Sequence, residues 1–281
     1  MVTKTKSVVV LLGAGAIGLA IARRVGAGKH VVLADISLEN VQAAAQTLED
    51  AGFETSTIIT DLSSRSSIRK LIEHAQRFGV VTNLINSAGL SPSQASIEAI
   101  LKVDLYGTAV LLEEFGNIIG EGGSGITISS QSGHRLGNIP EQESELLATT
   151  PAEALLDLPW LKNVDDTLKA YQYAKRCNSL RVMFEATAWS KRHATLNAIS
   201  PGIIMTPLAN DELKGSRGEG YRKMLANSPV GRAGTPDEVG DLAEFLMSSK
   251  GRFITGTDFL IDGGTTASYW YGDLQYLKQS H

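Results

Sequence analysis

The stretch VVVLLGAGAIGLAIARR, residues 8–24, decides the fold of this chain. Its first part, Val8–Leu12, is a β-branched and leucine run typical of a buried strand. Gly13, Gly15 and Gly18 follow at once and open an alanine-rich stretch typical of a helix. Glycines at this spacing let the chain turn tightly and let a pyrophosphate approach the free N–H groups at the positive end of the helix. By itself the pattern also fits a strand-to-helix turn that binds nothing.

The composition is that of a folded protein with little charge bias. The 281 residues correspond to one or two domains at roughly 150 residues each. Hydrophobic residues make up 43% of the chain, and 26 basic against 30 acidic residues leave a net charge of -4. These values disfavour a disordered chain and a nucleic-acid-binding protein, whose surface would be basic. The single cysteine, Cys177, excludes an intramolecular disulfide framework and fits a reducing compartment.

The uncharged run Val8–Ala22 superficially resembles a secretory signal, because lysines precede it and small residues end it. Its three glycines would interrupt a signal helix, and it is shorter than the roughly 18 apolar residues that a spanning helix needs. We therefore expect a cytoplasmic protein without a signal peptide or membrane anchor.

Short β-branched runs alternate with longer amphipathic or alanine-rich stretches, a pattern typical of βα units around a parallel sheet. Helical outlines at residues 37–51, 63–78 and 236–247 begin with residues suited to capping. The near absence of charge in the candidate strands indicates a sheet covered on both faces, hence a doubly wound α/β fold. The candidate strands are Val8–Leu12, Val31–Ala34, Glu54–Ile59, Val81–Asn86, Gly125–Ser129, Thr195–Ile199 and Asp258–Ile261.

Asp35 adds a second element to the glycine turn, because it ends the next candidate strand, 22 residues beyond Gly13. A carboxylate there can accept hydrogen bonds from both ribose hydroxyls of a dinucleotide and would repel a 2′-phosphate. Alternatively, Asp35 only stabilises the start of the following helix, by about 0.3 to 1 kcal/mol. The two elements together favour a dinucleotide site, with NAD rather than NADP as the cofactor.

Residues 134–170 interrupt the alternation with seven carboxylates, three basic residues and no candidate strand. A connection of this length is usually functional or disordered, and helical pieces at 151–157 and 165–169 favour a partly ordered lid. Its large apolar residues could line a cavity or only anchor the segment to the domain. They are Leu146, Leu147, Leu155, Leu156, Leu158, Trp160 and Leu161.

Three residues are candidates for catalysis. Tyr171 and Lys175 are four apart, so they share one face of a helix if this stretch is helical. A phenol is a poor acid/base catalyst at neutral pH until a cation such as Lys175 favours its phenolate. Ser130 closes a candidate strand and could donate a hydrogen bond to a carbonyl oxygen as charge develops on it. The ordinary alternatives are a helix surface pair and a serine bonded to backbone.

Further segments complete an ordered set of motifs. Asn86-Ser87-Ala88-Gly89 follows the fourth candidate strand, residues 128–133 contain Ser130, and residues 197–202 lead to Thr206-Pro207. With the glycine turn and the Y-x-x-x-K pair, these segments resemble the short-chain dehydrogenases/reductases along nearly the whole chain.

The resemblance implies a single-domain Rossmann fold of about seven strands and hydride transfer between the nicotinamide and a carbonyl carbon. Tyr171 would exchange the proton on oxygen, Ser130 would orient the carbonyl, and Lys175 would lower the pKa of Tyr171 and hold the nicotinamide ribose. The cofactor-binding residues that it implies are Gly13, Gly15, Ala16, Ile17, Gly18, Asp35, Ile36, Asp61, Leu62, Asn86, Ser87, Ala88, Gly89, Tyr171, Lys175, Pro201, Gly202, Ile204 and Thr206.

Three features depart from the family's pattern. The glycine turn is one residue shorter than T-G-x-x-x-G-x-G and has Ala16 in place of a glycine. Asp104 stands where the family's fourth catalytic residue is asparagine; a carboxylate near Lys175 would favour the ammonium, and we predict that Asp104 acts mainly through its backbone carbonyl. Ser130 and Tyr171 are 41 positions apart, which is unusually far, and the extra residues form the 134–170 insert.

We therefore predict an NAD(H)-dependent oxidoreductase that interconverts a secondary alcohol and a ketone. A dehydratase or epimerase that uses the same tyrosine and lysine is one alternative, which Asp262-Gly263-Gly264 disfavours because it resembles the simple reductases. A non-catalytic dinucleotide-sensing protein is another, although a sensor would have no need of Ser130, Tyr171 and Lys175 together.

The resemblance also implies a homo-oligomer, a tetramer or dimer, built from helices at residues 94–119 and 170–192. The five histidines and one cysteine show no metal-ligand spacing, so we expect no metal site. His134 could contact substrate, although a loop histidine is more often solvated. Residues 1–281 are expected to form one catalytic domain, with the insert at 134–170 and a C-terminal tail at 265–281.

Overall fold

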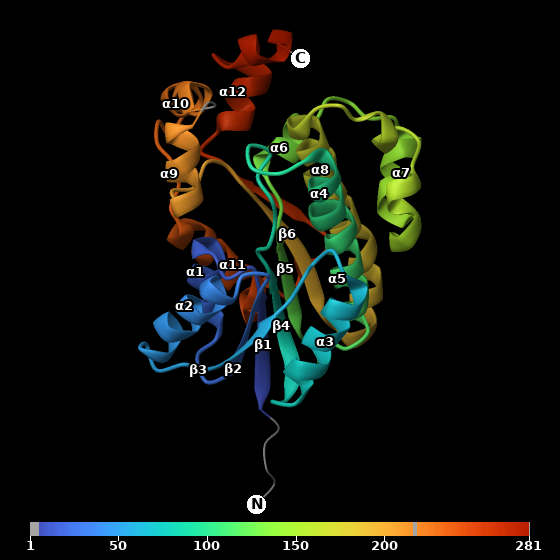
Figure 1. Cartoon of the computed structure of the whole chain (residues 1–281), viewed down its shortest axis with the longest axis vertical. Coiled ribbons are helices and arrows are strands. Elements are labelled where there is room, and N and C mark those ends of the chain that lie inside the picture. Colours follow the sequence, from blue (N-terminus) through green and yellow to red (C-terminus); the bar gives the residue numbers. More distant parts are fainter. Residues whose placement is uncertain (1–5, 216–217, 281) are drawn as a thin grey trace, which may run out of the picture.

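The computed structural model describes residues 6–215 and 218–280, in which seven strands form one parallel sheet (Figure 1). Each predicted strand is present, with its ends shifted by at most two residues. Residues 8–12 of β1 are fully or almost fully buried, so the sheet is covered on both faces, as predicted. The strands are β1 Ser7–Leu12, β2 His30–Asp35, β3 Glu54–Ile59, β4 Val80–Asn86, β5 Ser124–Ile128, β6 Thr195–Pro201 and β7 Asp258–Ile261.

The strand order is β3-β2-β1-β4-β5-β6-β7, so the chain winds outward from β1 in both directions. β1 pairs with β2 on one side and with β4 on the other, and the order reverses between β1 and β4. In open α/β sheets a crevice forms outside the carboxyl ends of the strands at this switch point. The fold is therefore the doubly wound Rossmann type, and it places a ligand crevice beside the glycine turn.

Helices cover the two faces of the sheet and form two separate apolar cores with it. One face carries α1 Ala16–Val25, α2 Leu38–Glu49 and α11 Pro236–Met247. The other carries α3 Arg65–Gln76, α5 Thr108–Gly116 and α8 Thr167–Trp189. The start of α2 is capped as the sequence predicts, because the Ser37 hydroxyl accepts from Asn40 N–H at 3.2 Å.

The helix predicted near residues 94–119 consists of three consecutive helical segments. A short α4, Ile97–Ile100, leads into a π-helical segment η1, Leu101–Gly107, which continues as α5. A Cβ on Gly107 would lie 2.5 Å from the Leu62 carbonyl oxygen, so this turn packs too closely for any side chain. π-helical turns occur frequently at functional sites, and this one contains Asp104.

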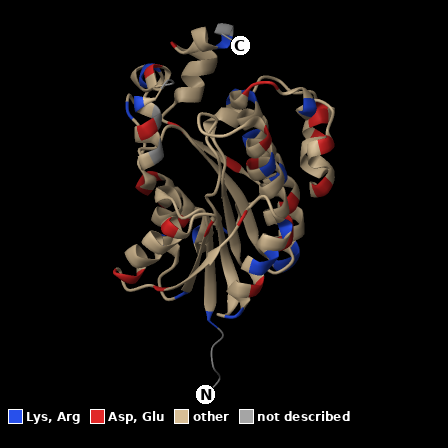
Figure 2. Cartoon of the chain, in the orientation of Figure 1, with Lys and Arg blue, Asp and Glu red and all other residues tan. Residues whose placement is uncertain are grey.

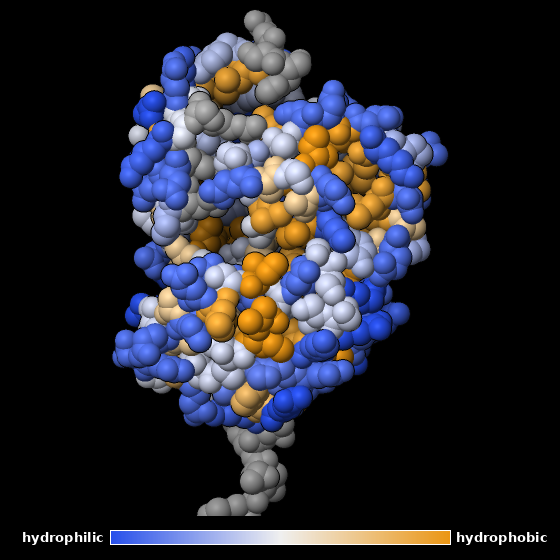
Figure 3. Space-filling view, in the orientation of Figure 1, coloured by the Kyte–Doolittle hydropathy of each residue, from blue (hydrophilic) through white to orange (hydrophobic). Residues whose placement is uncertain are grey.

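The insert is ordered and packs against the domain. It begins within α6 Gln131–Arg135 and contains α7 Glu141–Thr149 and the 3-10 turns η2 Ala152–Asp157 and η3 Leu161–Asn163. α7 lies on α8, and η2 lies on η1. Figure 2 shows acidic residues along α7, and Figure 3 shows apolar side chains gathered between α7 and the α4–α8 side.

The leucines of the insert anchor it and do not line a cavity. Leu147 and Leu155 are fully buried, and Leu158 and Leu161 nearly so, in the core that α8 shares with η1 and α5. Leu146, Leu156 and Trp160 pack against the same core. Of the two sequence-based interpretations of these seven residues, anchoring is therefore correct.

The last part of the chain stands across the crevice from α6 and the insert (Figure 1). It consists of α9 Pro207–Lys214, α10 Gly218–Ala226, α12 Thr265–Tyr271 and the 3-10 turn η6 Gln275–Ser280. Two further 3-10 turns, η4 Ser190–Arg192 and η5 Ser249–Gly251, link helices to strands. Within residues 6–215 and 218–280, none of the helices has the length and apolarity required to cross a membrane.

Candidate active site

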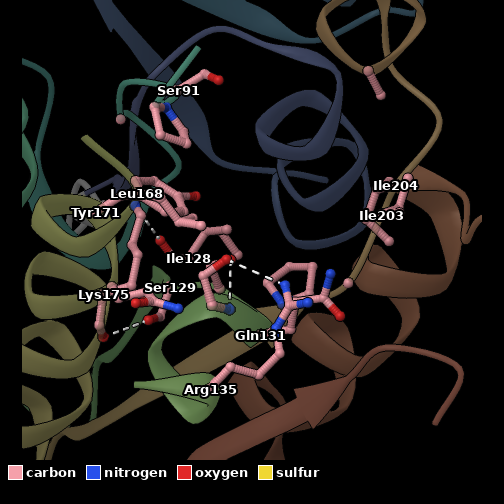
Figure 4. A pocket seen from close by; sticks show the side chains of 18 of the residues that line it. Ser91, Ile128, Ser129, Gln131, Arg135, Leu168, Tyr171, Lys175, Ile203 and Ile204 are labelled. Atoms are coloured by element: carbon pink, nitrogen blue, oxygen red, sulfur yellow. Dashed lines mark hydrogen bonds between the residues drawn. The ribbon is translucent and has the colours of Figure 1, made fainter. Parts of the chain in front are cut away.

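A cavity of about 610 Å³ lies at the carboxyl ends of β4, β5 and β6. Its floor and walls come from residues 87–92 after β4, 128–132 after β5 and 201–204 after β6. α8 contributes Tyr171 and Lys175, and α10 and α12 close the outer side. Figure 4 shows Tyr171 and Lys175 on one side of this space, with Ile203 and Ile204 across it. The fold thus brings residues more than 100 positions apart to a single site.

The glycine turn between β1 and α1 uses its three glycines differently. Gly13 has φ +90°, and a Cβ there would lie 2.3 Å from the Ala88 backbone nitrogen. A Cβ on Gly18 would lie 2.6 Å from the Gly13 carbonyl oxygen, so both positions require glycine for packing. A Cβ on Gly15 would meet no atom within 4 Å. The space beside Gly15 is open at a helix N-terminus, as a bound pyrophosphate would require.

Asp35 ends β2 next to this turn and is already engaged with backbone. One carboxylate oxygen accepts from Ala14 N–H at 2.9 Å, and the other accepts from Ser37 N–H at 2.9 Å. The helix-start interpretation of Asp35 is therefore part of its role. A carboxylate has about four lone-pair sites, so these two bonds leave capacity for ribose hydroxyls.

An apolar surface lies beside Asp35. The side chain of Ile36 is 71% exposed, and that of Ile59, at the end of the neighbouring β3, is 55% exposed. Asp61 follows β3, and its carboxylate accepts from the Ser63 N–H at 2.8 Å. Leu62 is buried in the core, so its side chain does not face this surface.

Ser130 caps the short helix α6 and lines the cavity. Its hydroxyl oxygen accepts from Ser132 N–H at 3.1 Å, which leaves the O–H group as a donor. α6 lies directly against α8, because a Cβ on Gly133 would fall 2.8 Å from the Arg176 backbone nitrogen. This close packing holds Ser130 on the same cavity wall as Tyr171.

Lys175 is buried behind Tyr171, with 4% of its surface exposed. Its Nζ lies 5.4 Å from the centre of the Tyr171 ring and 3.5 Å from the Ile128 carbonyl oxygen. Ser129 donates to the Lys175 carbonyl at 2.7 Å and so ties this turn of α8 to β5. Gly89 lies over the ammonium, because a Cβ on it would approach Nζ to 3.0 Å.

Asp104 pairs with Lys175 through its side chain. The carboxylate is fully buried, with Oδ2 3.5 Å from Lys175 Nζ and Oδ1 accepting from Leu90 N–H at 2.8 Å. Burial alone would lower the pKa of Lys175, but the charges of Asp104 and Tyr171 outweigh it and the pKa is raised. Once the Asn178 side-chain amide is turned so that its nitrogen faces acceptors, that nitrogen donates to the backbone carbonyl of Asp104 at 2.8 Å. The carboxylate of Asp104 therefore faces Lys175, and a role of Asp104 mainly through its backbone carbonyl stays a prediction.

His134 points away from the cavity. Its Nε2 lies 2.9 Å from Asp258 Oδ2, and that carboxylate also accepts from the Ser200 hydroxyl at 2.7 Å. The histidine thus links α6 to β7. This contact differs from both alternatives considered for His134, contact with substrate and simple solvation. Among the described residues, no group of three or more His, Cys, Asp or Glu side chains is arranged to hold a metal ion.

The structure divides the predicted site residues into three groups. Those that line the cavity are Ile17, Ser87, Ala88, Gly89, Ser130, Tyr171, Lys175, Pro201, Gly202, Ile204 and Thr206. Those around the glycine turn and the ends of β2 and β3 lie beside it: Gly13, Gly15, Ala16, Gly18, Asp35, Ile36 and Asp61. The side chains of Leu62, Asn86 and Asp104 are buried behind these surfaces.

Several cavity residues have no signal in the sequence. Arg135 is five positions after Ser130, but the register of α6 that directs it into the cavity is not visible in the residues alone. Tyr221, Met224 and Tyr269 reach the cavity from α10 and α12, whose position depends on the complete fold. Only the proximity of Arg135 to Ser130 could have marked it as a candidate.

Known proteins match this chain over most of its length. Residues 6–139 match a family model described as short chain dehydrogenase, and residues 162–266 match one described as Enoyl-(Acyl carrier protein) reductase. The short-chain dehydrogenase/reductase bsc3 of Alternaria brassicicola is 41% identical over 265 residues, covering 94% of this chain and 97% of that protein. The levodione reductase of Leifsonia aquatica is 26% identical over 282 residues, with 94% and 96% covered.

Solved structures show the same fold. A short-chain dehydrogenase/reductase from Serratia marcescens superposes with a TM-score of 0.73 at 21% identity, covering 93% of this chain and 98% of that one. A blue fluorescent protein from a metagenomic library, solved in complex with NADPH, gives 0.72 at 22% identity, with 92% and 97% covered.

Proposed function

This chain belongs to the short-chain dehydrogenase/reductase family of oxidoreductases, and we propose that it interconverts a secondary alcohol and a ketone with NAD(H) as cofactor. The observation that carries the proposal is the line of groups from Asp104 through Lys175 to Tyr171, which ends at a cavity also lined by Ser130. A buried carboxylate that keeps a lysine charged beside a phenol is suited to acid/base catalysis.

The chemistry proposed for the residues follows from their places. The nicotinamide, when bound, supplies or accepts the hydride. In ketone reduction, the Tyr171 hydroxyl donates its proton to the carbonyl oxygen, and the Ser130 O–H donates a hydrogen bond to the same oxygen as negative charge develops. The Lys175 ammonium stabilises the phenolate that remains. In alcohol oxidation the phenolate accepts the proton, and the same two groups act in reverse.

The residues present fit a dinucleotide. The open space at Gly15 and the start of α1 suit a pyrophosphate, and Asp35 suits the ribose hydroxyls. The exposed Ile36 side chain would pack on the adenine, and residues 87–89 and 201–206 would hold the nicotinamide end. The Asp35 carboxylate would repel a 2′-phosphate, which supports NAD over NADP.

The names of relatives support an alcohol/ketone reaction. Besides the levodione reductase, a protein 28% identical over 274 residues is a 2-(S)-hydroxypropyl-CoM dehydrogenase from Xanthobacter autotrophicus, which covers 92% of this chain. Both names denote redox chemistry at a hydroxyl or carbonyl group of a small molecule.

A reducing, cytoplasmic location fits the single cysteine. Cys177 is fully buried in α8 beneath the insert, and burial raises the pKa of its thiol to about 11. A thiol of this kind is inert and packs as a small apolar residue. We place the protein in the cytoplasm on this ground.

The proposal is tested by following nicotinamide absorbance with the purified protein on a broad panel of ketones and secondary alcohols. NAD(H) and NADP(H) are used in parallel at equal concentration. We expect turnover of some members of the panel, at a higher kcat/KM with NAD(H). Turnover with a clear NADP(H) preference would contradict our reading of Asp35, and no turnover across the panel would contradict the proposed reaction.

A further inference from the structure

Arg135 has no role in the reaction proposed above, yet its side chain lies among the groups that line the same cavity (Figure 4). It is the last residue of α6, the helix that begins after Ser130. Met224 of α10 and Tyr269 of α12 line the cavity beside it. We infer that Arg135 is an anion subsite that binds a carboxylate of the substrate, an inference that rests on the proposed function of this cavity.

The guanidinium lacks a strong acceptor. Its Nε is shut off from solvent and has no hydrogen-bond partner in the described structure. One terminal nitrogen donates to the Met224 sulfur at 3.1 Å, and the other approaches the Ser132 hydroxyl only to 3.5 Å. Sulfur is a weak acceptor, and 3.5 Å is at the limit of a hydrogen bond. The Tyr269 ring, 5.7 Å from Cζ, adds only a cation–π contact.

Two other partly buried arginines of the described chain are paired with carboxylates, whereas the buried Arg181 donates to the Thr150 carbonyl. Arg65 contacts Glu113, Glu114 and Glu153, and Arg24 contacts Asp237 and Asp241. Within residues 6–215 and 218–280, Arg135 forms no ion pair. Burial lowers the pKa of Arg135 and outweighs the opposing effects of Tyr269 and of the Asp262 carboxylate, which forms no ion pair with it. A buried charge without an ion-pair partner costs free energy, and an anionic ligand that paired with Arg135 would offset this cost.

The charged groups around Arg135 favour a carboxylate over other anionic ligands. The other cation of the cavity lining, Lys175, is already paired with Asp104. The one carboxylate of the lining, Asp166, caps α8 and accepts from Leu168 N–H at 3.1 Å. One unpaired guanidinium matches the single charge of a carboxylate, and its planar edge suits the two carboxylate oxygens.

The cavity lining as a whole also contains apolar and aromatic side chains. They include Leu168, Ile203, Tyr221, Met224, Tyr269 and Leu277. A keto acid or hydroxy acid with an apolar body would therefore place its carboxylate on Arg135 and its carbonyl or hydroxyl carbon toward Tyr171.

The test compares keto acids with their methyl esters, which keep the ketone and remove the charge. The probes are 4-oxocyclohexanecarboxylate and 4-oxopentanoate with the two esters, assayed with NADH on wild type, Arg135→Gln and Arg135→Lys. Arg77→Gln, an exposed arginine at the end of α3, is the matched control. We expect wild type to prefer the acids and Arg135→Gln to lose roughly 10- to 100-fold in kcat/KM on the acids alone. Arg135→Lys should recover part of the loss.

A binding measurement separates this inference from the proposed reaction. The affinity of each acid and ester for the protein with saturating NAD⁺ is measured by calorimetry for the same variants. Binding of an acid that depends on Arg135 without any turnover would keep the subsite and contradict the proposed reaction. Reduction of esters with no preference for acids would keep the reaction and overturn the subsite. Failure of wild type to bind either acid more tightly than its ester, or equal binding by Arg135→Gln, would also overturn it.

Discussion

Asp104 and Lys175 form a buried ion pair beside Tyr171, so the phenol experiences the fields of both charges. In the related enzymes that the sequence resembles, a neutral asparagine takes the place of Asp104. A carboxylate partly cancels the field of the ammonium at the phenol, so it should weaken the preference for phenolate. At the residue scale, this pair is the main point on which the chemistry of this chain differs from the family's pattern.

We predict that Asp104→Asn shifts the acid limb of the pH–rate profile for alcohol oxidation to lower pH. Oxidation requires the Tyr171 phenolate, and removal of the carboxylate leaves the Lys175 charge uncompensated, which lowers the pKa of the phenol. A shift of about one pH unit is expected, typical of one nearby charge. The measurement is log(kcat/KM) against pH with NAD⁺ and an alcohol taken from the active panel.

Asp50→Asn, an exposed substitution at the end of α2, is the control and should leave the profile in place. An unchanged profile in Asp104→Asn would show that the carboxylate does not affect Tyr171 and that Asp104 acts through its backbone carbonyl alone. A shift to higher pH would mean that Lys175 needs Asp104 to stay protonated, and it would contradict the predicted direction of the shift.

The glycine turn gives a second prediction at the residue scale. Gly15→Ala adds a Cβ that meets no protein atom within 4 Å, so the free energy of unfolding should change little. The same methyl would occupy the open space assigned to the pyrophosphate, and NADH affinity should fall about tenfold, or about 1.4 kcal/mol. Titration of protein fluorescence with NADH, together with thermal unfolding, measures both quantities.

Gly13→Ala is the matched variant with the opposite expectation. Its φ is +90° and its Cβ would clash with Ala88, so it should lower the melting temperature. Equal NADH affinity in Gly15→Ala and wild type would contradict the proposal that the pyrophosphate binds at this turn.

At the scale of elements, the insert behaves as part of the core. α7 and η2 cover α8 and η1, and Arg65 of α3 reaches Glu153 of η2 at 2.7 Å. Tyr106 of η1 donates to the same carboxylate at 3.1 Å. The insert meets the cavity only near its two ends, through Arg135, Asp166 and Leu168. A lid function for it stays a prediction, and such a lid would act through those ends.

We predict that Leu155→Ala lowers the free energy of unfolding by about 2–5 kcal/mol, because it empties space in a closed core. Since Leu155 does not line the cavity, kcat and KM should stay at the wild-type values below the melting temperature. Denaturant unfolding and steady-state kinetics check the two parts. A raised KM without a loss of stability would instead indicate that the leucines of the insert line the substrate cavity.

The sequence was sufficient for elements with a strong local signal and insufficient for those that depend on packing. The strands were recognisable from β-branched runs such as Val8–Leu12, and the Ser37 cap from its residue type. The π-helical turn around Asp104 was not recognisable, and neither was the close packing of Gly107, at its end, against the Leu62 backbone. Likewise, nothing local distinguishes His134, which binds Asp258 of β7, from Arg135, which lines the cavity.

At the scale of the whole molecule, the insert occupies surface that we expected to serve assembly. The predicted oligomer used helices near 94–119 and 170–192, and α7 and η2 now lie against parts of both. On α8, Met183 and Phe184 are still exposed, at 61% and 41%. Assembly stays a prediction. If these helices form the contact, they can do so only through the surface that the insert leaves uncovered.

In the proposed reaction Tyr171 is the proton donor of a hydride-transfer enzyme, and one comparison of variants tests this role most directly. Tyr171→Phe and wild type are assayed with NADH and an active ketone, and NADH binding is titrated for both. We predict that Tyr171→Phe loses at least about 100-fold in kcat while its NADH affinity stays within about twofold of wild type. Wild-type turnover by Tyr171→Phe, with cofactor binding intact, would contradict the central claim.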